Sequence, residues 1–150
     1  MRRKIRRKRG PVVSKKTTID GIKFASGLEA YMYKALKAAN IPAAYEGSTY
    51  TIFQGFNFQG VCYERCGNGK GDYKNRGNKK IFNIKYTPDF VGKGFIIETK
   101  GRANESFPLR WKMFKKLLTE NKIGPFTLYK PQNQKECDET IRLILLKQNT

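Results

Sequence analysis

Histidine is absent from this chain of 150 residues. Without histidine, the Ser-His-Asp and Cys-His arrangements of nucleophilic catalysis are impossible, and so are nucleases that use a histidine base. Structural zinc almost always takes four Cys or His ligands, and the chain offers only Cys62, Cys66 and Cys137. Ordinary thiols are therefore the favoured interpretation of the cysteines, and any catalysis must depend on carboxylates, lysine, tyrosine and a bound metal ion.

Long hydrophobic runs are also missing. No apolar run reaches about 18 residues, and no apolar stretch of roughly 7–15 residues follows the basic N-terminus. We therefore expect neither a membrane span nor a secretory signal, and the odd number of cysteines argues against a disulfide framework. These absences predict a cytoplasmic protein; an organellar transit peptide is a weaker interpretation of the Arg-rich start.

Negative charge is scarce, because 12 Asp and Glu residues accompany 31 Lys and Arg residues for a formal net charge of +19. A charge of this size predicts polyanionic partners. Nine of the basic residues lie within the first sixteen positions, and subtracting them leaves +10 for the rest of the chain. Residues 1–19 lack periodic apolar positions and are predicted to form a disordered basic arm, followed by a single domain over residues 20–150.

Apolar spacing and turn residues predict alternating helices and strands in that domain. Helices are expected from Ser26 to about Asn40, from Pro108 to about Asn121, and from Asn133 onward. Strands are expected at residues 45–58 with a break near Gly55, and at 81–91, 95–100 and 126–130. Between them, residues 65–80 are predicted to be a Gly/Asn-rich basic loop with a charge of +5 from six basic residues and one Asp.

The most informative stretch is Tyr86-Thr87-Pro88-Asp89-Phe90, followed by Glu98-Thr99-Lys100. On a strand, Glu98 and Lys100 share a face while Thr99 points away. A two-residue turn at Gly92-Lys93 would pair Asp89 with Ile96 and bring its carboxylate to that shared face, whereas a three-residue turn would direct it to the other side. In the first register, Asp89 and Glu98 would offer oxygen ligands to Mg²⁺, and Lys100 would orient the attacking water.

A structural interpretation stays open beside the catalytic one. Asp89 would simply end a strand after a proline, and Glu98 with Lys100 would be a solvated edge pair, although the apolar run before Glu98 predicts a buried strand. Ser26-Gly27-Leu28-Glu29 is a capping-box pattern, in which the Glu29 carboxylate returns a hydrogen bond to the Ser26 N–H. The functional alternative makes Glu29 a third acidic group that faces the predicted hairpin.

Taken together, the Ser-Gly-Leu-Glu, Tyr-Thr-Pro-Asp-Phe and Ile-Glu-Thr-Lys-Gly segments resemble the PD-(D/E)xK nuclease superfamily over about residues 22–130. They look most like the phage-type endonuclease I family of Holliday-junction resolvases. The resemblance implies an α/β fold with a restriction-endonuclease-like core, in which helices flank a mixed central sheet in the order α-β-β-β-α-β, with an extra C-terminal helix.

The resemblance also implies roles for individual residues. Asp89, Glu98 and the backbone carbonyl of Thr99 would bind metal, Lys100 would assist the nucleophile, and Glu29 would contribute to a second metal site. One or two Mg²⁺ ions are expected in each active site, with Mn²⁺ as a substitute. Glu46 is a weaker candidate for a supporting acidic position.

As a function, the resemblance implies a metal-dependent endonuclease that hydrolyses phosphodiesters at branched DNA such as four-way junctions. Family members act as homodimers with strands exchanged between protomers. The chain departs from this pattern at about residues 56–80, which look like a basic Gly-rich insertion and leave strand exchange open. The alternatives are a nuclease acting on linear duplex DNA and a non-enzymatic basic nucleic-acid-binding protein.

Phosphate contacts are predicted for basic residues in the arm, in the Gly-rich segment and around the second predicted helix. These residues are Arg2, Arg3, Lys4, Arg6, Arg7, Lys15, Lys16, Lys70, Lys74, Arg76, Arg102, Arg110, Lys112, Lys115 and Lys116. A solvated charged surface is the alternative for each of them.

Overall fold

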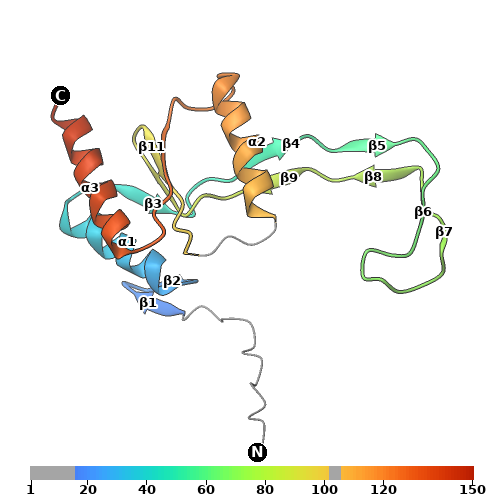
Figure 1. Ribbon diagram of the computed structural model, residues 1–150, viewed down its shortest axis with the longest axis horizontal. Coiled ribbons are helices and arrows are strands. Elements are labelled where there is room, and N and C mark those ends of the chain that lie inside the picture. The colour runs from blue at the N-terminus through green and yellow to red at the C-terminus, as the bar shows by residue number, and fades with distance from the viewer. Residues whose placement is uncertain (1–15, 102–105) are drawn as a thin grey trace, which may run out of the picture.

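The computed structural model describes residues 16–101 and 106–150 as a mixed α/β fold with three helices. Figure 1 shows that the helices gather in one body, from which a long two-stranded ribbon projects to one side. No helix in the described residues is long and apolar enough to cross a membrane. The mixed α/β class predicted from the sequence is confirmed.

A four-stranded mixed sheet forms the centre of the body. Its strands are β3 (Ala43–Tyr45), β10 (Phe90–Gly92), β11 (Phe95–Ile97) and β12 (Thr127–Tyr129), in the spatial order β12-β11-β10-β3. The β3–β10 and β10–β11 pairs are antiparallel, and the β11–β12 pair is parallel. Together with the helices, these strands follow the chain order helix, three strands, helix, strand, helix.

Helices cover both faces of this sheet. The helices are α1 (Gly27–Ala38), α2 (Phe107–Thr119) and α3 (Gln134–Gln148). Phe95 and Ile97 belong to a core cluster that includes residues of α1 and α3, whereas Ile96 belongs to a second cluster with residues of α2. Because side chains alternate along a strand, β11 separates the two clusters and is buried on both sides.

Local sequence signals account for the helix starts. The side chains of Ser26 and Asn133 accept hydrogen bonds from the backbone N–H groups of Glu29 and Glu136, which are N-terminal donors without intrahelical partners. A proline stands in the first turn of α2, where its missing N–H costs nothing. The predicted starts of the three helices are therefore confirmed to within one residue.

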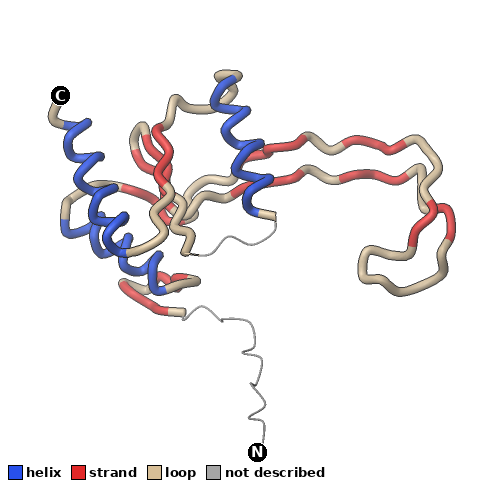
Figure 2. The backbone as a smooth tube through the Cα atoms, in the orientation of Figure 1, coloured by secondary structure: helices blue, strands red, loops and turns tan. Residues whose placement is uncertain are grey.

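The projecting ribbon corrects in part the prediction of a loop at residues 65–80, because residues 65–73 belong to no strand but residues 74–75 and 79–80 are paired. It consists of three antiparallel pairs: β4 (Tyr50–Phe53) with β9 (Ile84–Tyr86), β5 (Phe56–Phe58) with β8 (Lys79–Ile81), and β6 (Tyr63–Glu64) with β7 (Lys74–Asn75). We call residues 53–83 the outer ribbon; Figure 2 shows its strands running out from the body and back. β5 lies within the strand predicted at residues 45–58, beyond the predicted break near Gly55. The strands β6 to β8 are exposed on both faces, so no apolar alternation marked them in the sequence.

The predicted disordered arm ends earlier than expected. Residues 17–19 form β1 (Thr17–Ile19), which pairs with β2 (Ile22–Phe24) across the two-residue turn Asp20-Gly21. Both turn residues have positive φ, 52° and 76°, as a type I′ hairpin turn requires. The Asp-Gly pair explains why the chain turns here despite its many charges. The rest of the predicted arm, residues 1–15, lies outside the described residues.

Candidate active site

Three carboxylates are buried in the described part of the chain, and all three were predicted as site residues. Glu29, Asp89 and Glu98 have exposed fractions of only 9%, 9% and 5%. A buried charge is costly unless it is paired or bound to a metal ion. The burial of Glu98 therefore contradicts the alternative in which Glu98 and Lys100 form a solvated edge pair.

The β10–β11 hairpin brings Asp89 and Glu98 together. Its register pairs Gly92 with Phe95 and Phe90 with Ile97, so Asp89 and Glu98 come next, opposite each other at the end away from the turn. The predicted pairing of Asp89 with Ile96 is wrong by two residues. Since side-chain direction repeats every two residues, the shift preserves the predicted common face.

The position of the hairpin turn explains this shift. The turn residues are Lys93 and Gly94, not Gly92 and Lys93, and Gly94 has a φ of 78° that glycine adopts without steric cost. At Gly92, a Cβ atom would stand 2.0 Å from the ring of the buried Phe95. Gly92 is therefore needed as a strand residue that lets the Phe95 ring cross the hairpin.

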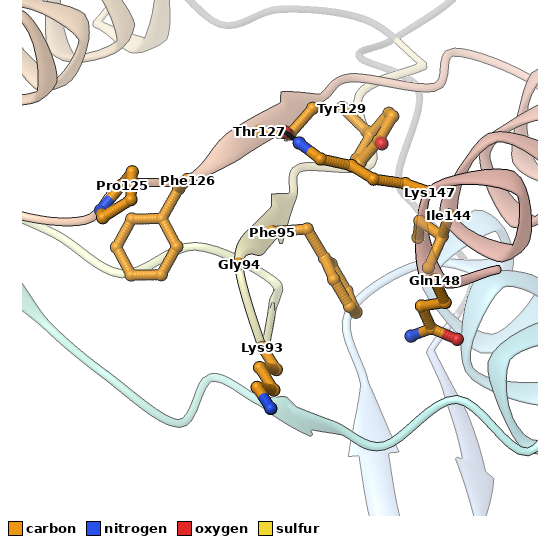
Figure 3. A pocket seen from close by; sticks show the side chains of 10 residues that line it. All are labelled: Lys93, Gly94, Phe95, Pro125, Phe126, Thr127, Tyr129, Ile144, Lys147 and Gln148. Carbon is orange, nitrogen blue, oxygen red and sulfur yellow. Dashed lines mark hydrogen bonds between the residues drawn. The ribbon is translucent and has the colours of Figure 1, made fainter. Parts of the chain in front are cut away.

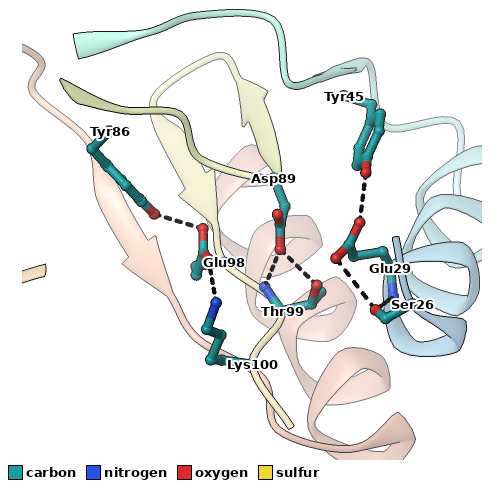
Figure 4. Close-up of polar contacts among 8 residues, drawn as sticks. All are labelled: Ser26, Glu29, Tyr45, Tyr86, Asp89, Glu98, Thr99 and Lys100. Carbon is teal, nitrogen blue, oxygen red and sulfur yellow. Dashed lines mark hydrogen bonds and ion pairs between the residues drawn. The ribbon is translucent and has the colours of Figure 1, made fainter. Parts of the chain in front are cut away.

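Asp89 is anchored by Thr99. Its Oδ2 atom accepts hydrogen bonds from the Thr99 backbone N–H at 2.8 Å and from the Thr99 hydroxyl at 2.7 Å, as Figure 4 shows. The prediction that the Thr99 side chain points away is wrong, because its hydroxyl bonds to Asp89. No hydrogen bond reaches Oδ1 of Asp89 from the described residues, so this oxygen remains available to a ligand.

Glu98 is anchored by Tyr86. The buried Tyr86 hydroxyl donates a 2.6 Å hydrogen bond to Glu98 Oε2, and Lys100 Nζ lies 3.7 Å from Oε1. The Lys100 ammonium also lies 4.6 Å from the centre of the Phe107 ring, a cation–π distance. Backbone bonds from the Glu98 and Lys100 N–H groups to Tyr129 and Pro131 extend the parallel pairing beyond β11, which keeps both side chains on one side.

The pKa values of the acidic pair follow from this environment. Burial raises the pKa of Asp89 to about 7, and the neighbouring Glu98 and Glu29 carboxylates add to the rise, while the bonds from Thr99 oppose it. Burial also raises the pKa of Glu98, against the opposing effects of the Tyr86 hydrogen bond and the Lys100 charge. The two carboxylates thus hold negative charge that the described protein groups compensate only in part.

Glu29 serves the start of α1 and also acts on the acidic pair. Its backbone N–H donates to Ser26 Oγ at 3.2 Å, so the predicted cap is confirmed. The carboxylate bonds to the Ala25 N–H at 3.3 Å instead of the Ser26 N–H, and its Oε2 also accepts a 2.6 Å bond from the Tyr45 hydroxyl. Its charge helps to raise the pKa of Asp89, although Figure 4 shows it beside the pair and not joined to it.

The donor set around Asp89 and Glu98 fits a hard cation with few protein ligands. Within residues 16–101 and 106–150, no three His, Cys, Asp or Glu side chains converge on one possible metal position. Mg²⁺ commonly takes one or two carboxylates and completes its shell with water and phosphate oxygens. Asp89 and Glu98 match that requirement, whereas the predicted second site at Glu29 is not assembled by a further acidic side chain.

Two tyrosines of the candidate site were not predicted from the sequence. Tyr86 belongs to the Tyr-Thr-Pro-Asp-Phe motif, and its place three residues before Asp89 was the only signal available for it. For Tyr45 the sequence holds no signal, because its contact with Glu29 spans 16 residues and depends on tertiary packing. Glu46, the predicted supporting acid, is exposed, and its backbone N–H donates to the Asp89 carbonyl.

The predicted phosphate-binding residues fall into three groups. Lys16, Lys70, Lys74, Arg110, Lys112, Lys115 and Lys116 are exposed, whereas Arg2, Arg3, Lys4, Arg6, Arg7, Lys15 and Arg102 lie outside the described residues. Arg76 is half-buried, and its guanidinium donates to the carbonyls of Glu64 and Asp72 at 3.0 and 3.2 Å. These bonds hold the end of the outer ribbon together, and this structural role accounts for Arg76 without a contact to DNA.

A separate hollow lies between the β10–β11 turn, β12 and the end of α3. It is lined by residues that include Lys93, Phe95, Phe126 and Lys147, and Figure 3 shows these side chains around it. The Lys147 ammonium is bonded to the Thr127 hydroxyl at 2.6 Å. None of the buried carboxylates lines this hollow, so it is distinct from the acidic site.

Comparison with known proteins gives a family but no characterised relative. No curated protein and no solved structure matches the chain. A family model described as "Protein of unknown function (DUF1064)" matches residues 9–128, which include Glu29, Asp89, Glu98 and Lys100 and stop before α3. This match covers most of the chain, which therefore belongs to the DUF1064 family.

Proposed function

We propose that this protein is a Mg²⁺-dependent endonuclease that hydrolyses phosphodiesters in branched DNA, with Asp89, Glu98 and Lys100 as catalytic residues. The observation that carries the proposal is the burial of Asp89 and Glu98 side by side, next to Lys100, in a chain with a net charge of +19. Carboxylates repel a phosphodiester unless a cation lies between them, so an acidic centre in a basic protein favours metal-assisted chemistry on a polyanion.

The arrangement of the sheet supports a finer proposal for the fold. The three antiparallel strands, the parallel fourth strand and the helices on both faces agree with the restriction-endonuclease-like core that the PD-(D/E)xK resemblance implies. Asp89 precedes the second strand of this order, and Glu98 and Lys100 follow the third. We therefore propose this core for the present chain.

Each carboxylate presents one oxygen and has the other anchored. Thr99 holds Oδ2 of Asp89, and Tyr86 holds Oε2 of Glu98, so Mg²⁺ would bind Oδ1 of Asp89 and Oε1 of Glu98, the oxygen that also faces the Lys100 ammonium. When bound, Mg²⁺ supplies positive charge that stabilises the negative charge developing on the phosphate. These hydrogen bonds restrict the two side chains before the ion binds, so less conformational entropy is lost on binding. They also fix the direction in which the two carboxylates point.

Lys100 is the basic residue of the proposed site. Its ammonium contacts Glu98 Oε1 on one side and the face of Phe107 on the other, so its position is restricted before substrate binds. From there it would orient the attacking water or neutralise charge on the phosphate. Exposed lysines on α2, including Lys112 and Lys115, would contact DNA phosphates without reading sequence.

Branched DNA and a homodimer are proposed on the basis of the resemblance. Resolution of a four-way junction requires two strands to be cut, and a dimer provides two copies of the site. Each described strand pairs within the single chain, so strand exchange is not needed to complete the sheet that carries Asp89 and Glu98.

The test compares wild type with Asp89→Asn and Glu98→Gln on four-way junction, flap, nicked and linear DNA, with and without Mg²⁺. We expect wild type to cut the junction only with Mg²⁺, and both variants to bind it but to lose cleavage by about 100-fold or more. Asp138→Asn, which changes an exposed carboxylate on α3, is the matched control and should cut normally.

Three results would contradict parts of the proposal. Unchanged cleavage in both variants would remove the proposed site. Equal cutting of linear duplex and junction would contradict the proposed preference for branched DNA, but it would agree with the proposed nuclease activity. Binding with a steep salt dependence and no cleavage by wild type would favour the non-enzymatic binding protein.

A further inference from the structure

The outer ribbon concentrates exposed hydrophobic side chains. Of the eleven large hydrophobic side chains exposed in the described residues, eight lie in this segment: Phe53, Phe56, Phe58, Val61, Tyr63, Tyr73, Ile81 and Phe82. Tyr73 and Phe82 are the most open of these, each with 72% of its surface accessible. Soluble proteins rarely expose apolar groups in such a cluster unless the cluster binds something.

The register of the ribbon places aromatic and basic groups next to each other. Phe56 lies opposite Ile81, and Phe58 lies opposite Lys79, so these four side chains share one face. Lys80 projects from the other face, and its ammonium lies 5.5 Å from the centre of the Phe82 ring. Each face therefore offers an aromatic surface with a lysine beside it.

These lysines are available to an anionic partner. Lys70, Lys74, Lys79 and Lys80 are exposed, and none of them forms an ion pair with another residue that the structure describes. The outer ribbon contains six basic residues and two acidic ones, a net charge of +4. Two copies of such a segment repel each other, so its charge favours a polyanion over a second copy of this chain.

Aromatic rings beside ammonium groups suit nucleic acid with unpaired bases. An exposed ring stacks on a base only if the base is not already stacked in a duplex, while lysines contact phosphates in either form. Tyr63 and Tyr73, with ring centres 6.1 Å apart, add a second aromatic position toward the end of the ribbon. The ribbon thus combines the two groups that single-strand-binding surfaces use.

We propose that the outer ribbon binds unpaired nucleotides, with Phe82 and Tyr73 stacking on bases and Lys79 and Lys80 contacting phosphates. This inference rests on the proposed function in taking DNA as the partner. It adds the feature of the substrate that is recognised, namely unpaired bases, and assigns the recognition to the outer ribbon, which projects from the body in Figure 1.

The test measures binding in the presence of a metal chelator, so that cleavage plays no part. The probes are a fluorescent oligothymidylate of about 20 nucleotides, longer than the roughly 4–16 nucleotides that a single binding module covers, and a blunt duplex with the same number of phosphates. The variants are Phe82→Leu, Tyr73→Leu, Phe82→Tyr and the double variant of Lys79→Gln with Lys80→Gln. Leu109→Ala, an exposed position on α2, is the control.

We expect Phe82→Leu and Tyr73→Leu each to weaken oligothymidylate binding by about tenfold and to leave duplex binding within about twofold. Phe82→Tyr should bind like wild type because the ring remains, and Leu109→Ala should bind both probes normally. The lysine variant should weaken both probes and reduce the salt dependence of binding.

Equal binding of oligothymidylate by wild type and both leucine variants would overturn the inference, and so would equal losses on single strand and duplex. A change in oligomeric state on sedimentation, with unchanged single-strand binding, would instead identify the ribbon as an interface between copies. These results are separable from the nuclease proposal. Normal single-strand binding by the ribbon variants would contradict only the ribbon inference and not the proposed roles of Asp89 and Glu98. Normal cleavage by Asp89→Asn would contradict only the proposed active site and not the ribbon inference.

Discussion

The hydroxyl of Tyr86 donates a 2.6 Å hydrogen bond to Glu98 Oε2, and both side chains are buried. Tyr86 lies on β9, the last strand of the ribbon before the chain enters the central sheet, whereas Glu98 follows β11 of that sheet. Burial, and then the charge and hydrogen bond of Glu98, raise the pKa of Tyr86, so it remains a donor at any working pH. The tyrosine thus positions one oxygen of a proposed metal ligand.

Tyr86→Phe tests this positioning role. The change removes the hydroxyl with almost no loss of volume, and we expect it to cost about 1–3 kcal/mol of stability, because Glu98 Oε2 loses its donor. Cleavage should fall about tenfold, and the Mg²⁺ concentration for half-maximal activity should rise, since Glu98 is less well oriented. Tyr31→Phe is the control, because its hydroxyl bonds to the exposed Asp138. Loss of stability with unchanged Mg²⁺ dependence would reduce Tyr86 to a structural role.

Asp89→Asn should change how stability depends on pH. Asp89 has a pKa of about 7 in the folded protein against 3.8 as its ordinary value, so the folded state keeps this proton to higher pH. In wild type without metal, Asp89 therefore lowers stability as pH rises from about 4 to about 7, by on the order of 4 kcal/mol. In a chelator at about pH 8, the asparagine variant should be the more stable protein, and the difference should disappear toward pH 4.

Wild type and Asp89→Asn also allow metal binding to be measured without any assay of cleavage. Mg²⁺ added at about pH 8 should raise the melting temperature of wild type, because the ion offsets the repulsion between Asp89 and Glu98. The asparagine variant should respond much less. Thermal unfolding followed by circular dichroism with and without Mg²⁺ measures both effects, and parallel stability profiles for the two proteins would contradict the assignment of the perturbed pKa to Asp89.

Glu29→Gln and Ser26→Ala separate the cap of α1 from the acidic site. Ser26→Ala removes the acceptor for the Glu29 N–H and should cost about 1 kcal/mol, with normal cleavage by the folded fraction. Glu29→Gln keeps the shape and an acceptor for the Tyr45 hydroxyl but removes a buried charge, so we expect little loss of stability. Cleavage assays on both variants decide between the two roles of Glu29. If Glu29 takes part in catalysis, Glu29→Gln should cleave more slowly than Ser26→Ala. If Glu29 serves only the helix cap, Glu29→Gln should cleave at least as fast as Ser26→Ala.

Gly92→Ala tests the packing that sets the hairpin register. The new Cβ would stand 2.0 Å from the Phe95 ring, so the ring must move within the core, and we expect a loss of about 1–3 kcal/mol. Gly94→Ala meets no atom within 4 Å but places alanine at a φ of 78°, with a cost of about 1 kcal/mol. Chemical denaturation compares the two, and a smaller loss for Gly92→Ala would argue against register control by Phe95.

Much of the fold follows from local chemistry that a sequence reveals. Ser26 and Asn133 mark helix starts because their side chains accept the first free N–H groups, wherever the helices lie in the fold. β6, β7 and most of β8 in the outer ribbon were not predicted as strands, because both of their faces are exposed and strands are recognised by the contrast between a buried and an exposed face. The Asp20-Gly21 hairpin was overlooked because the dense charges around it suggested disorder.

The amino-acid sequence by itself determined which carboxylates are the candidates for the site and the order in which they follow one another, because the motif residues lie at strand ends and at a helix start. Tertiary structure alone decided their partners. Phe95 against Gly92 set the register that puts Asp89 opposite Glu98, and the N–H and hydroxyl of Thr99 fixed one oxygen of Asp89. Such contacts depend on packing between segments far apart in the chain, which neither spacing nor local propensity encodes.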